Sequence, residues 1–390
     1  MSDFDVVRSR RGTGSYKWDT TVGEGLLERG AYPLSVADME FRTPAAVREA
    51  IKDFAESGFF CYTDADGEYR DAVRGFMSRR HGWNIDNEWI TCTGGVVCAI
   101  NTAVRAFSQP GEGVIIQTPV YYPFRTAIEN NGRRLFENPL VTDADGNYVM
   151  NLAELETLAS RDDVKMLLLC SPHNPVCRVW SASELRAVGD ICLKNGVTVI
   201  SDEIHFDITS KPHTVFTLAD RRFAQNTVIC TAVSKSFNLA GLGTSNVIIE
   251  NEALRERFRK ALASDGYTCI NCVSRPATIA AYTLCDDWLD EVNAYIDANF
   301  ELLFSYAERL PGVEICKREG TYLAWLDMRG LGFGSDEELD SFLQQQCLII
   351  PDPGYWFGKG GSGFTRLNLA SPRPALEAAL ERLSEKLMKR

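Results

Sequence analysis

One lysine, Lys235, follows a short apolar run at 227–231 and stands among small and hydroxyl-bearing residues, in the string Ala-Val-Ser-Lys-Ser-Phe-Asn. The run has the length and composition of a buried strand, so the lysine is expected at a strand end near the core. An unpaired lysine is rare in such surroundings. A lysine amine with a lowered pKa is what Schiff-base chemistry needs, so Lys235 is the first candidate for covalent catalysis.

Polar residues also follow two other apolar runs. Asp202 and His205 come after the run at 197–201, and Asn174 lies between two prolines after the run at 165–170. A strand-end aspartate can hold a pyridine nitrogen protonated, which makes the ring an electron sink. The plainer interpretations are a structural turn around Asn174 and a surface loop around Asp202. The run before Asp202 is too apolar to place the carboxylate far from the core.

A glycine-rich turn at 93–97, Thr-Gly-Gly-Val-Val, is typical of a passage from a strand into a helix. The free backbone N–H groups at the start of a helix could hold an anion such as a phosphate. Taken alone, this turn is a weak sign of phosphate binding. In combination with a strand-end lysine and aspartate, it is much more specific.

The elements that must position these residues alternate along the middle of the chain. Helical segments separate short apolar runs that are typical of buried strands, at 114–117, 165–170, 197–201, 227–231 and 245–250. One helix is expected to begin at Ser181, where Glu184 completes a capping box, and to stop near Asn195. This alternation predicts an α/β fold with a mostly parallel sheet flanked by helices. Ligands bind outside the carboxyl ends of strands in such sheets, so the polar groups above are expected to share one site.

The pattern changes after about residue 285. Apolar residues at steps of three and four predict a long helix from Leu289 to Leu310. A smaller α+β domain is predicted by the segments that follow, with strands at 320–327, 347–350 and 364–369 and helices at 336–346 and 375–388. The predicted organisation is an N-terminal arm at 1–43 that joins the small domain, a large domain at 44–284 and a small C-terminal domain at 285–390.

The composition limits the classes of molecule that this protein is expected to bind. The chain has 390 residues and a net charge of −12, which argues against nucleic acid or an anionic membrane as the main partner. No secretory signal and no apolar stretch of about 18 residues is found, so a cytoplasmic location is expected. The twelve cysteines are then expected to be reduced thiols. Cys269 and Cys272 form a C-x-x-C pair, but nothing completes a zinc pattern, and no metal is expected.

Several longer strings carry a resemblance to a known family. The chain resembles the fold-type I enzymes that depend on pyridoxal 5′-phosphate (PLP), the aspartate aminotransferase superfamily, over nearly its whole length. Within it the chain resembles the MalY/PatB branch of cystathionine β-lyases and C–S lyases. The strings that carry this resemblance are Val36-Ala37-Asp38-Met39-Glu40-Phe41, Gln117-Thr118-Pro119-Val120-Tyr121-Tyr122-Pro123, Ser171-Pro172-His173-Asn174-Pro175, Ser201-Asp202-Glu203-Ile204-His205, Ser234 to Leu242, and Arg366-Leu367-Asn368-Leu369-Ala370.

The resemblance implies roles for individual residues around the cofactor. Lys235 is expected to bind PLP covalently and Asp202 to pair with its ring nitrogen. Asn174 is expected to contact both the phenolic oxygen and the substrate, and His205 lies where most aminotransferases of this superfamily carry a tyrosine that contacts that oxygen. The ring face is assigned to Tyr121, which with Lys235 is also the expected catalytic pair. The phosphate is assigned to Gly95, Val96, Val97, Ser234 and a Tyr62 from the partner subunit.

The same resemblance implies which residues bind the substrate. Arg366 is expected to bind the α-carboxylate, a bidentate task that suits guanidinium, and Tyr122 is expected to line the substrate pocket. The departures from the family pattern are Cys177, Cys61, Cys98, Ser35 and Gly243. Gly243 stands where aspartate aminotransferase relatives place a phosphate-binding arginine, so the phosphate is expected to rely on amides, hydroxyls and another cation.

The expected activity is α,β-elimination on L-cystathionine, L-cysteine or other cysteine S-conjugates, giving thiol, pyruvate and ammonia. The first alternative is an aminotransferase, which shares every cofactor residue. The second is a regulatory protein that uses the fold for contacts with a protein partner; both roles could coexist. The resemblance also implies a homodimer with shared active sites.

Overall fold

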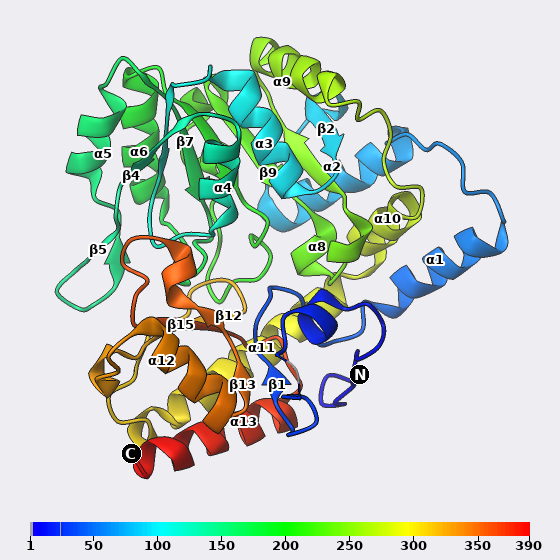
Figure 1. The fold of residues 1–390 in the computed structure, drawn as a ribbon. Coiled ribbons are helices and arrows are strands. Elements are labelled where there is room, and N and C mark those ends of the chain that lie inside the picture. Colours follow the sequence, from blue (N-terminus) through cyan, green and yellow to red (C-terminus); the bar gives the residue numbers. More distant parts are fainter. Residues whose placement is uncertain (1–2, 24) are drawn as a thin grey trace.

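The computed structural model describes residues 3–23 and 25–390, and its centre is a seven-stranded sheet (Figure 1). The strand order is β2-β10-β9-β8-β7-β3-β4. All neighbours are parallel except β10, which is antiparallel to both β9 and β2. The strands are β2 (Ile90–Thr93), β3 (Gly113–Ile116), β4 (Arg134–Glu137), β7 (Val164–Cys170), β8 (Thr198–Asp202), β9 (Thr227–Thr231) and β10 (Ser245–Ile248).

A layer of helices covers each face of this sheet, because the central strands carry apolar side chains on both faces. Along β7, Met166, Leu168 and Cys170 pack into one apolar cluster, and Leu167 and Leu169 pack into the other. The first cluster includes α3 (Val96–Phe107), α4 (Pro123–Asn130) and α9 (Glu252–Ser264). The second includes α2 (Gly67–His81), α5 (Leu152–Ala159), α6 (Ala182–Lys194), α7 (Phe216–Ala219) and α10 (Ser274–Leu284). The predicted α/β architecture is confirmed.

The helix predicted to begin at Ser181 forms as α6. The Ser181 hydroxyl accepts a hydrogen bond from the Glu184 N–H at 3.3 Å, and the Glu184 carboxylate accepts one from the Ser181 N–H at 2.8 Å. The helix ends at Lys194, one residue before Asn195. The capping box therefore fixes this helix from local sequence alone.

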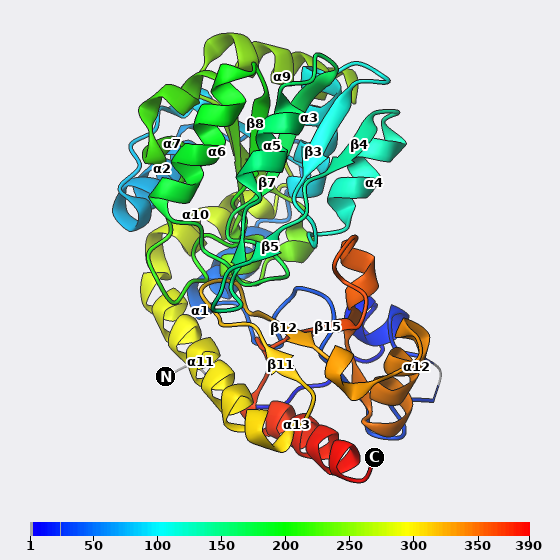
Figure 2. The same ribbon diagram turned by 90° about the vertical axis from the view of Figure 1, so that its left-hand side faces the viewer.

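A second, smaller sheet lies below the first in both views (Figures 1 and 2). Its strand order is β11-β12-β15-β14, from β11 (Glu314–Ile315), β12 (Leu323–Asp327), β14 (Asp352–Pro353) and β15 (Phe364–Asn368). Around it lie α12 (Asp336–Ser341) and α13 (Arg373–Met388), and α11 (Asp286–Ser305) runs down one side to reach it. The N-terminal arm joins this part, because β1 (Tyr32–Pro33) pairs with β13 (Ile349–Ile350).

Two predicted boundaries in this region are wrong. The long helix ends as α-helix at Ser305 and continues as a 3-10 turn at Ala307–Arg309. The helix expected at 336–346 is helical over these residues, as α-helix to Ser341 and as π-helix from Phe342 to Gln346. The strand expected from Gly320 begins only at Leu323. Thr321 has a φ of 64° and its N–H donates to the Ile208 carbonyl of the large domain at 2.7 Å, so the chain is not extended just before Leu323. The domain boundaries at 43/44 and 284/285 stay predictions.

Three further features complete the described elements. They are α1 (Ala45–Glu56), α8 (Val233–Ser236) and the hairpin of β5 (Val141–Thr142) and β6 (Tyr148–Val149). Short 3-10 or π turns complete the connections. Among the described residues, no helix is both long enough and apolar enough to cross a membrane.

Candidate active site

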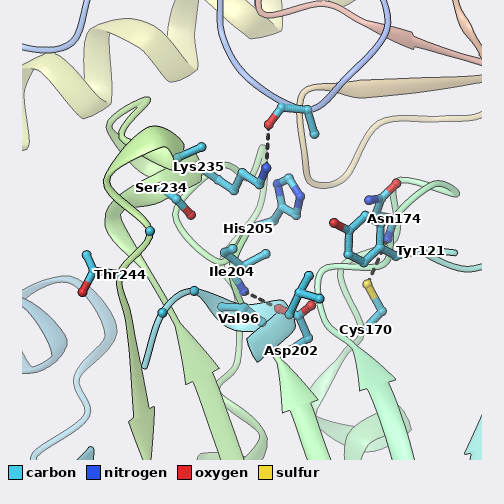
Figure 3. A pocket seen from close by; sticks show the side chains of 16 residues that line it. Val96, Tyr121, Cys170, Asn174, Asp202, Ile204, His205, Ser234, Lys235 and Thr244 are labelled. Carbon is cyan, nitrogen blue, oxygen red and sulfur yellow. Dashed lines mark hydrogen bonds between the residues drawn. The ribbon is translucent and has the colours of Figure 1, made fainter. Parts of the chain in front are cut away.

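A cavity of about 300 Å³ opens at the carboxyl ends of β7, β8 and β9 (Figure 3). Side chains from separate strand ends point into it, as expected for a sheet of this topology. It is lined by Ala37, Gly94, Gly95, Val96, Val97, Tyr121, Cys170, Asn174, Asp202, Ile204, His205, Ser234, Lys235, Ala240, Gly243 and Thr244. Nine of the twelve residues predicted to bind cofactor or substrate are in this lining, and Arg366 reaches it through a hydrogen bond to Asn174.

Lys235 lies on the short helix α8, directly after β9. Its Nζ donates a hydrogen bond to the carbonyl oxygen of Ala37 at 2.6 Å. Burial lowers the pKa of this amine to about 8, partly opposed by the negative charge of Asp38. A larger fraction of the amine is therefore neutral near pH 7 than for an exposed lysine, which is the state that reacts with an aldehyde.

Asp202 is the last residue of β8 and faces the same cavity. Its carboxylate accepts one hydrogen bond, from the N–H of Ile204 at 3.2 Å, and it has no ion-pair partner within the described part of the chain. Burial raises the pKa of this carboxyl to about 7, although Lys235 acts in the opposite direction. A cationic ring nitrogen placed against it would lower that pKa again.

The turn between β2 and α3 forms an anion cradle beside these groups. Gly95 has a φ of 106°, a backbone conformation that side chains disfavour, and no side chain of a described residue caps the helix. The first N–H groups of α3, including those of Val96 and Val97, have no partner within the helix. Ser234 and Thr244 bring buried hydroxyl groups to the same cavity. This end of the cavity suits a phosphate.

Asn174, Tyr121 and His205 form the opposite wall. The backbone carbonyl of Asn174 accepts a hydrogen bond from the Tyr121 N–H at 3.1 Å, which joins the two loops. Burial lowers the pKa of His205 well below its usual value, so the imidazole is neutral. Its Nδ1 is buried and has no hydrogen-bond partner among the residues that the structure describes. An orphaned polar atom in a cavity wall is expected where a bound group supplies the partner.

Arg366 extends from the middle of β15 toward this wall. Its Nη1 donates to the Oδ1 of Asn174 at 2.8 Å, and its Nε and Nη2 donate to Asp352 at 3.1 and 2.5 Å. The guanidinium lies over the ring of Phe357, 4.8 Å from its centroid. A buried guanidinium held on three sides is suited to bind a carboxylate in one orientation.

Comparisons with known proteins agree with this geometry. The profile of the aminotransferase class I and II family matches residues 29–383. Cystathionine beta-lyase PatB of Bacillus subtilis is 41% identical over 388 residues, which cover 99% of this chain and 100% of that protein. The chain belongs to the class I and II aminotransferase family.

Further proteins similar to this aminotransferase-family chain include a C–S lyase. Protein MalY of Escherichia coli is 34% identical, covering 97% of this chain and 96% of that protein. The crystal structure of cystalysin from Treponema denticola, which contains a pyridoxal 5′-phosphate cofactor, matches with a TM-score of 0.95 and 41% identity, covering 100% and 99% of the two chains. The PLP-bound C–S lyase from Staphylococcus hominis has a TM-score of 0.91 at 29% identity, covering 100% and 99%.

Besides Arg366, two predicted residues of this family member, Tyr62 and Tyr122, lie outside the cavity lining. Tyr62 is 96% exposed and reaches no part of the site in its own chain. Tyr122 is 38% exposed and packs beside Trp356, with ring centroids 5.8 Å apart, at the side of Arg366. Their assigned roles stay predictions.

Sequence reasoning missed three groups at the site: the Ala37 carbonyl, Thr244 and Asp352. Ala37 lies in the string Val36 to Phe41, which carries part of the family resemblance. The sequence therefore drew attention to this segment, but it did not predict the contact with Lys235. Thr244 follows Gly243, which stands where relatives place a phosphate-binding arginine. A hydroxyl-bearing residue beside that position could have been recognised as a further candidate for phosphate binding. Nothing in the local pattern around Asp352 indicated an ion pair with Arg366.

Proposed function

We propose that this protein is a PLP-dependent carbon–sulfur β-lyase that cleaves cysteine S-conjugates such as L-cystathionine. The observation that carries the proposal is the placement of Lys235 and Asp202 in the wall of one cavity, next to an anion cradle. PLP has three polar ends: an aldehyde, a ring nitrogen and a phosphate. The cavity offers a partner for each, namely a reactive amine, a carboxylate without a cation and an anion cradle. The similarity to cystathionine beta-lyase PatB and to the C–S lyase of Staphylococcus hominis supports lyase chemistry.

The residues present fit this cofactor. We assign Lys235 to the covalent link, Asp202 to the ring nitrogen, and Asn174 and His205 to the phenolic oxygen, with Tyr121 on the ring face. Gly95, Val96, Val97 and Ser234 are assigned to the phosphate, and Thr244 joins them as an additional hydroxyl. When bound, PLP supplies an electron-accepting ring that stabilises negative charge on the substrate α-carbon.

Side chains of this protein bind the substrate and transfer the protons. Arg366 binds the α-carboxylate and so fixes the bond to the α-hydrogen relative to the cavity. Nζ of Lys235, with its lowered pKa, accepts that proton and delivers it to the sulfur that leaves Cβ. Asp202 holds a proton on the ring nitrogen throughout. With one water, the balance of the reaction is a thiol, pyruvate and ammonia from each cysteine S-conjugate.

The test is to incubate the PLP-loaded protein with L-cystathionine and measure pyruvate and free thiol, which are expected in equal amounts. An aminotransferase would instead need a 2-oxo acid, would leave the cofactor as pyridoxamine phosphate and would release no pyruvate from cystathionine. That outcome would reject the lyase assignment while leaving the cofactor assignments in place.

We place the enzyme in the cytoplasm. All twelve cysteines are free thiols, which suits a reducing compartment. The substrate is a small amino acid; neither nucleic acid nor a membrane is assigned a role.

The exposed segment that contains Tyr62 supports a homodimer. Phe59 and Phe60 are 73% and 63% exposed beside it, and apolar side chains gathered in this way on a surface favour contact with another chain. We assign Tyr62 to the phosphate of the partner's site, where its hydroxyl would supply one more hydrogen bond.

This assignment predicts complementation between two inactive variants. In a heterodimer of Tyr62→Phe and Lys235→Ala chains, one site receives both substitutions and the other receives neither. Mixed dimers should then recover about half of the wild-type activity per dimer, provided that each homodimer is much less active. Activity is measured after the chains are co-expressed with different tags and purified through both. Mixed dimers no more active than the two homodimers would place Tyr62 outside the partner's site.

A further inference from the structure

Asp352 is a buried carboxylate at the edge of the active site. It is 3% exposed and lies on β14, where the strand register places it directly opposite Arg366 on β15. A single oxygen, Oδ2, accepts three hydrogen bonds: from Nε of Arg366 at 3.1 Å, from Nη2 of Arg366 at 2.5 Å and from the backbone N–H of Val36 at 3.0 Å. Asp352 therefore joins the guanidinium to a segment 316 residues away in sequence.

These bonds decide which edge of Arg366 stays free. A guanidinium carries five N–H donors in a fixed plane. Asp352 occupies the Nε–Nη2 edge, and Asn174 accepts from Nη1 at 2.8 Å. One N–H on each Nη atom remains, and these two form the fork that a carboxylate binds in the bidentate mode. With Asp352 in place, the guanidinium cannot turn its Nε edge toward a ligand.

The third bond of Asp352 holds a strained turn. Val36 has a φ of 52°, which is a rare conformation for a β-branched residue and persists only where surrounding contacts enforce it. Asn368 Nδ2 donates to the Val36 carbonyl at 2.7 Å and to the Asp38 carbonyl at 2.6 Å. The next carbonyl in this turn, that of Ala37, accepts the bond from Lys235 Nζ. Asp352 thus contacts both the carboxylate-binding group and the turn that receives the lysine amine.

We propose that Asp352 is a positioning residue that presents the Nη1–Nη2 edge of Arg366 to the substrate carboxylate and fixes the turn opposite Lys235. The proposal rests on the proposed function in one respect, the assignment of Arg366 to the α-carboxylate. Asp352 touches neither the reacting atoms nor the cofactor cavity, and it acts through Arg366 and Val36.

The test compares a carboxylate ligand with its amide in wild-type protein and in Asp352→Asn. 2-Methylalanine has no α-hydrogen, so it binds without being consumed, and 2-methylalaninamide differs only in lacking the carboxylate charge. Affinities for the PLP-loaded proteins are measured by calorimetry. Because an asparagine cannot accept the charge-assisted bonds that orient Arg366, the wild-type preference for the acid over the amide should fall about tenfold in the variant. A purely structural loss would weaken both ligands alike.

Two further variants secure the interpretation. Asp352→Ser removes the carboxylate and leaves space for water, and it should show the same loss of preference if Asp352→Asn does not fold. Asp327→Asn removes a carboxylate from β12 of the same sheet, where Asp327 pairs with Arg329 at 2.6 Å, and it should keep the wild-type preference.

Three results would contradict either the Asp352 proposal or the lyase function, and each result shows which of the two fails. An unchanged preference in both Asp352 variants defeats the positioning role and leaves the lyase function standing. Equal wild-type affinity for acid and amide defeats it as well, because Arg366 would then not bind the carboxylate. A lost preference in the variants together with no pyruvate from the wild-type protein supports Asp352 and rejects the lyase function.

Discussion

Replacing Lys235 with alanine is expected to abolish pyruvate formation, with kcat reduced by about 10³-fold or more. The residue is assigned two tasks, the covalent link to PLP and the transfer of the α-proton, and proton transfer by a positioned side chain alone contributes about 10² to 10⁴-fold. In the structure its Nζ lies 2.6 Å from the Ala37 carbonyl, inside the cavity that also receives Asp202. Among the residues that line this cavity, it is the one lysine.

Steady-state kinetics with L-cystathionine measures this loss, and a second readout tests the covalent link. Borohydride treatment of the wild-type protein should attach the cofactor to the peptide that contains residue 235, and mass mapping locates it. Lys235→Arg should be as inactive as the alanine variant, because a guanidinium keeps its charge and does not condense with an aldehyde. Lys165→Ala changes a partly exposed lysine near the start of β7, outside the cavity, and should leave kcat unchanged. Cofactor found on another lysine would overturn the assignment.

Asp202→Asn is expected to lower kcat by about 10² to 10³-fold while the protein still binds PLP. An amide of the same shape cannot stabilise a protonated ring nitrogen, so the ring becomes a poorer electron acceptor in the transition state. The loss should appear mainly in kcat, because the phosphate cradle and Arg366 are untouched. A variant with wild-type kcat would show that the carboxylate does not serve the ring nitrogen.

The same substitution has a predicted effect on stability in protein from which the cofactor has been removed. Burial raises the pKa of the Asp202 carboxyl from 3.8 to about 7 in the folded state. Between these values the folded protein binds a proton that the unfolded chain has released. The contribution of this group to the free energy of unfolding therefore falls as the pH rises from about 4 to 7, by about 4 kcal/mol.

Urea unfolding at several pH values measures this contribution as the difference between wild-type and Asp202→Asn proteins. The wild-type protein should lose stability relative to the variant as the pH rises through this window. A difference that stays constant from pH 4 to 7 would mean that the carboxyl is not desolvated in the fold.

Local patterns predicted much of the lining of the cavity. Lys235, Asp202 and Asn174 each follow an apolar run, and β9, β8 and β7 form from those runs. In a parallel sheet, residues after successive strands meet at one edge, so their convergence could be inferred without coordinates. The capping box at Ser181 likewise fixed the start of α6, because its hydrogen bonds join residues only three apart.

The segments after residue 285 were predicted less well, because long-range packing overrides local preference there. The helix α11 was expected to reach Leu310 from its apolar spacing, but it ends at Ser305. The strand expected from Gly320 starts at Leu323, because Thr321 adopts a φ of 64° and its N–H donates to Ile208 of the large domain. Hydrophobic periodicity indicates neither of these two departures.

The sequence by itself determined the residue types that can hold an aldehyde, a ring nitrogen and a phosphate, and the alternating pattern that gathers them at one sheet edge. Only the tertiary structure decided how they are held. The bond from Lys235 to Ala37 spans 198 residues, and the bond from Val36 to Asp352 spans 316. Hydrophobic periodicity and capping signals act over a few residues. Contacts at such separations depend instead on how the N-terminal arm and the small sheet pack over the large one, which no local pattern encodes.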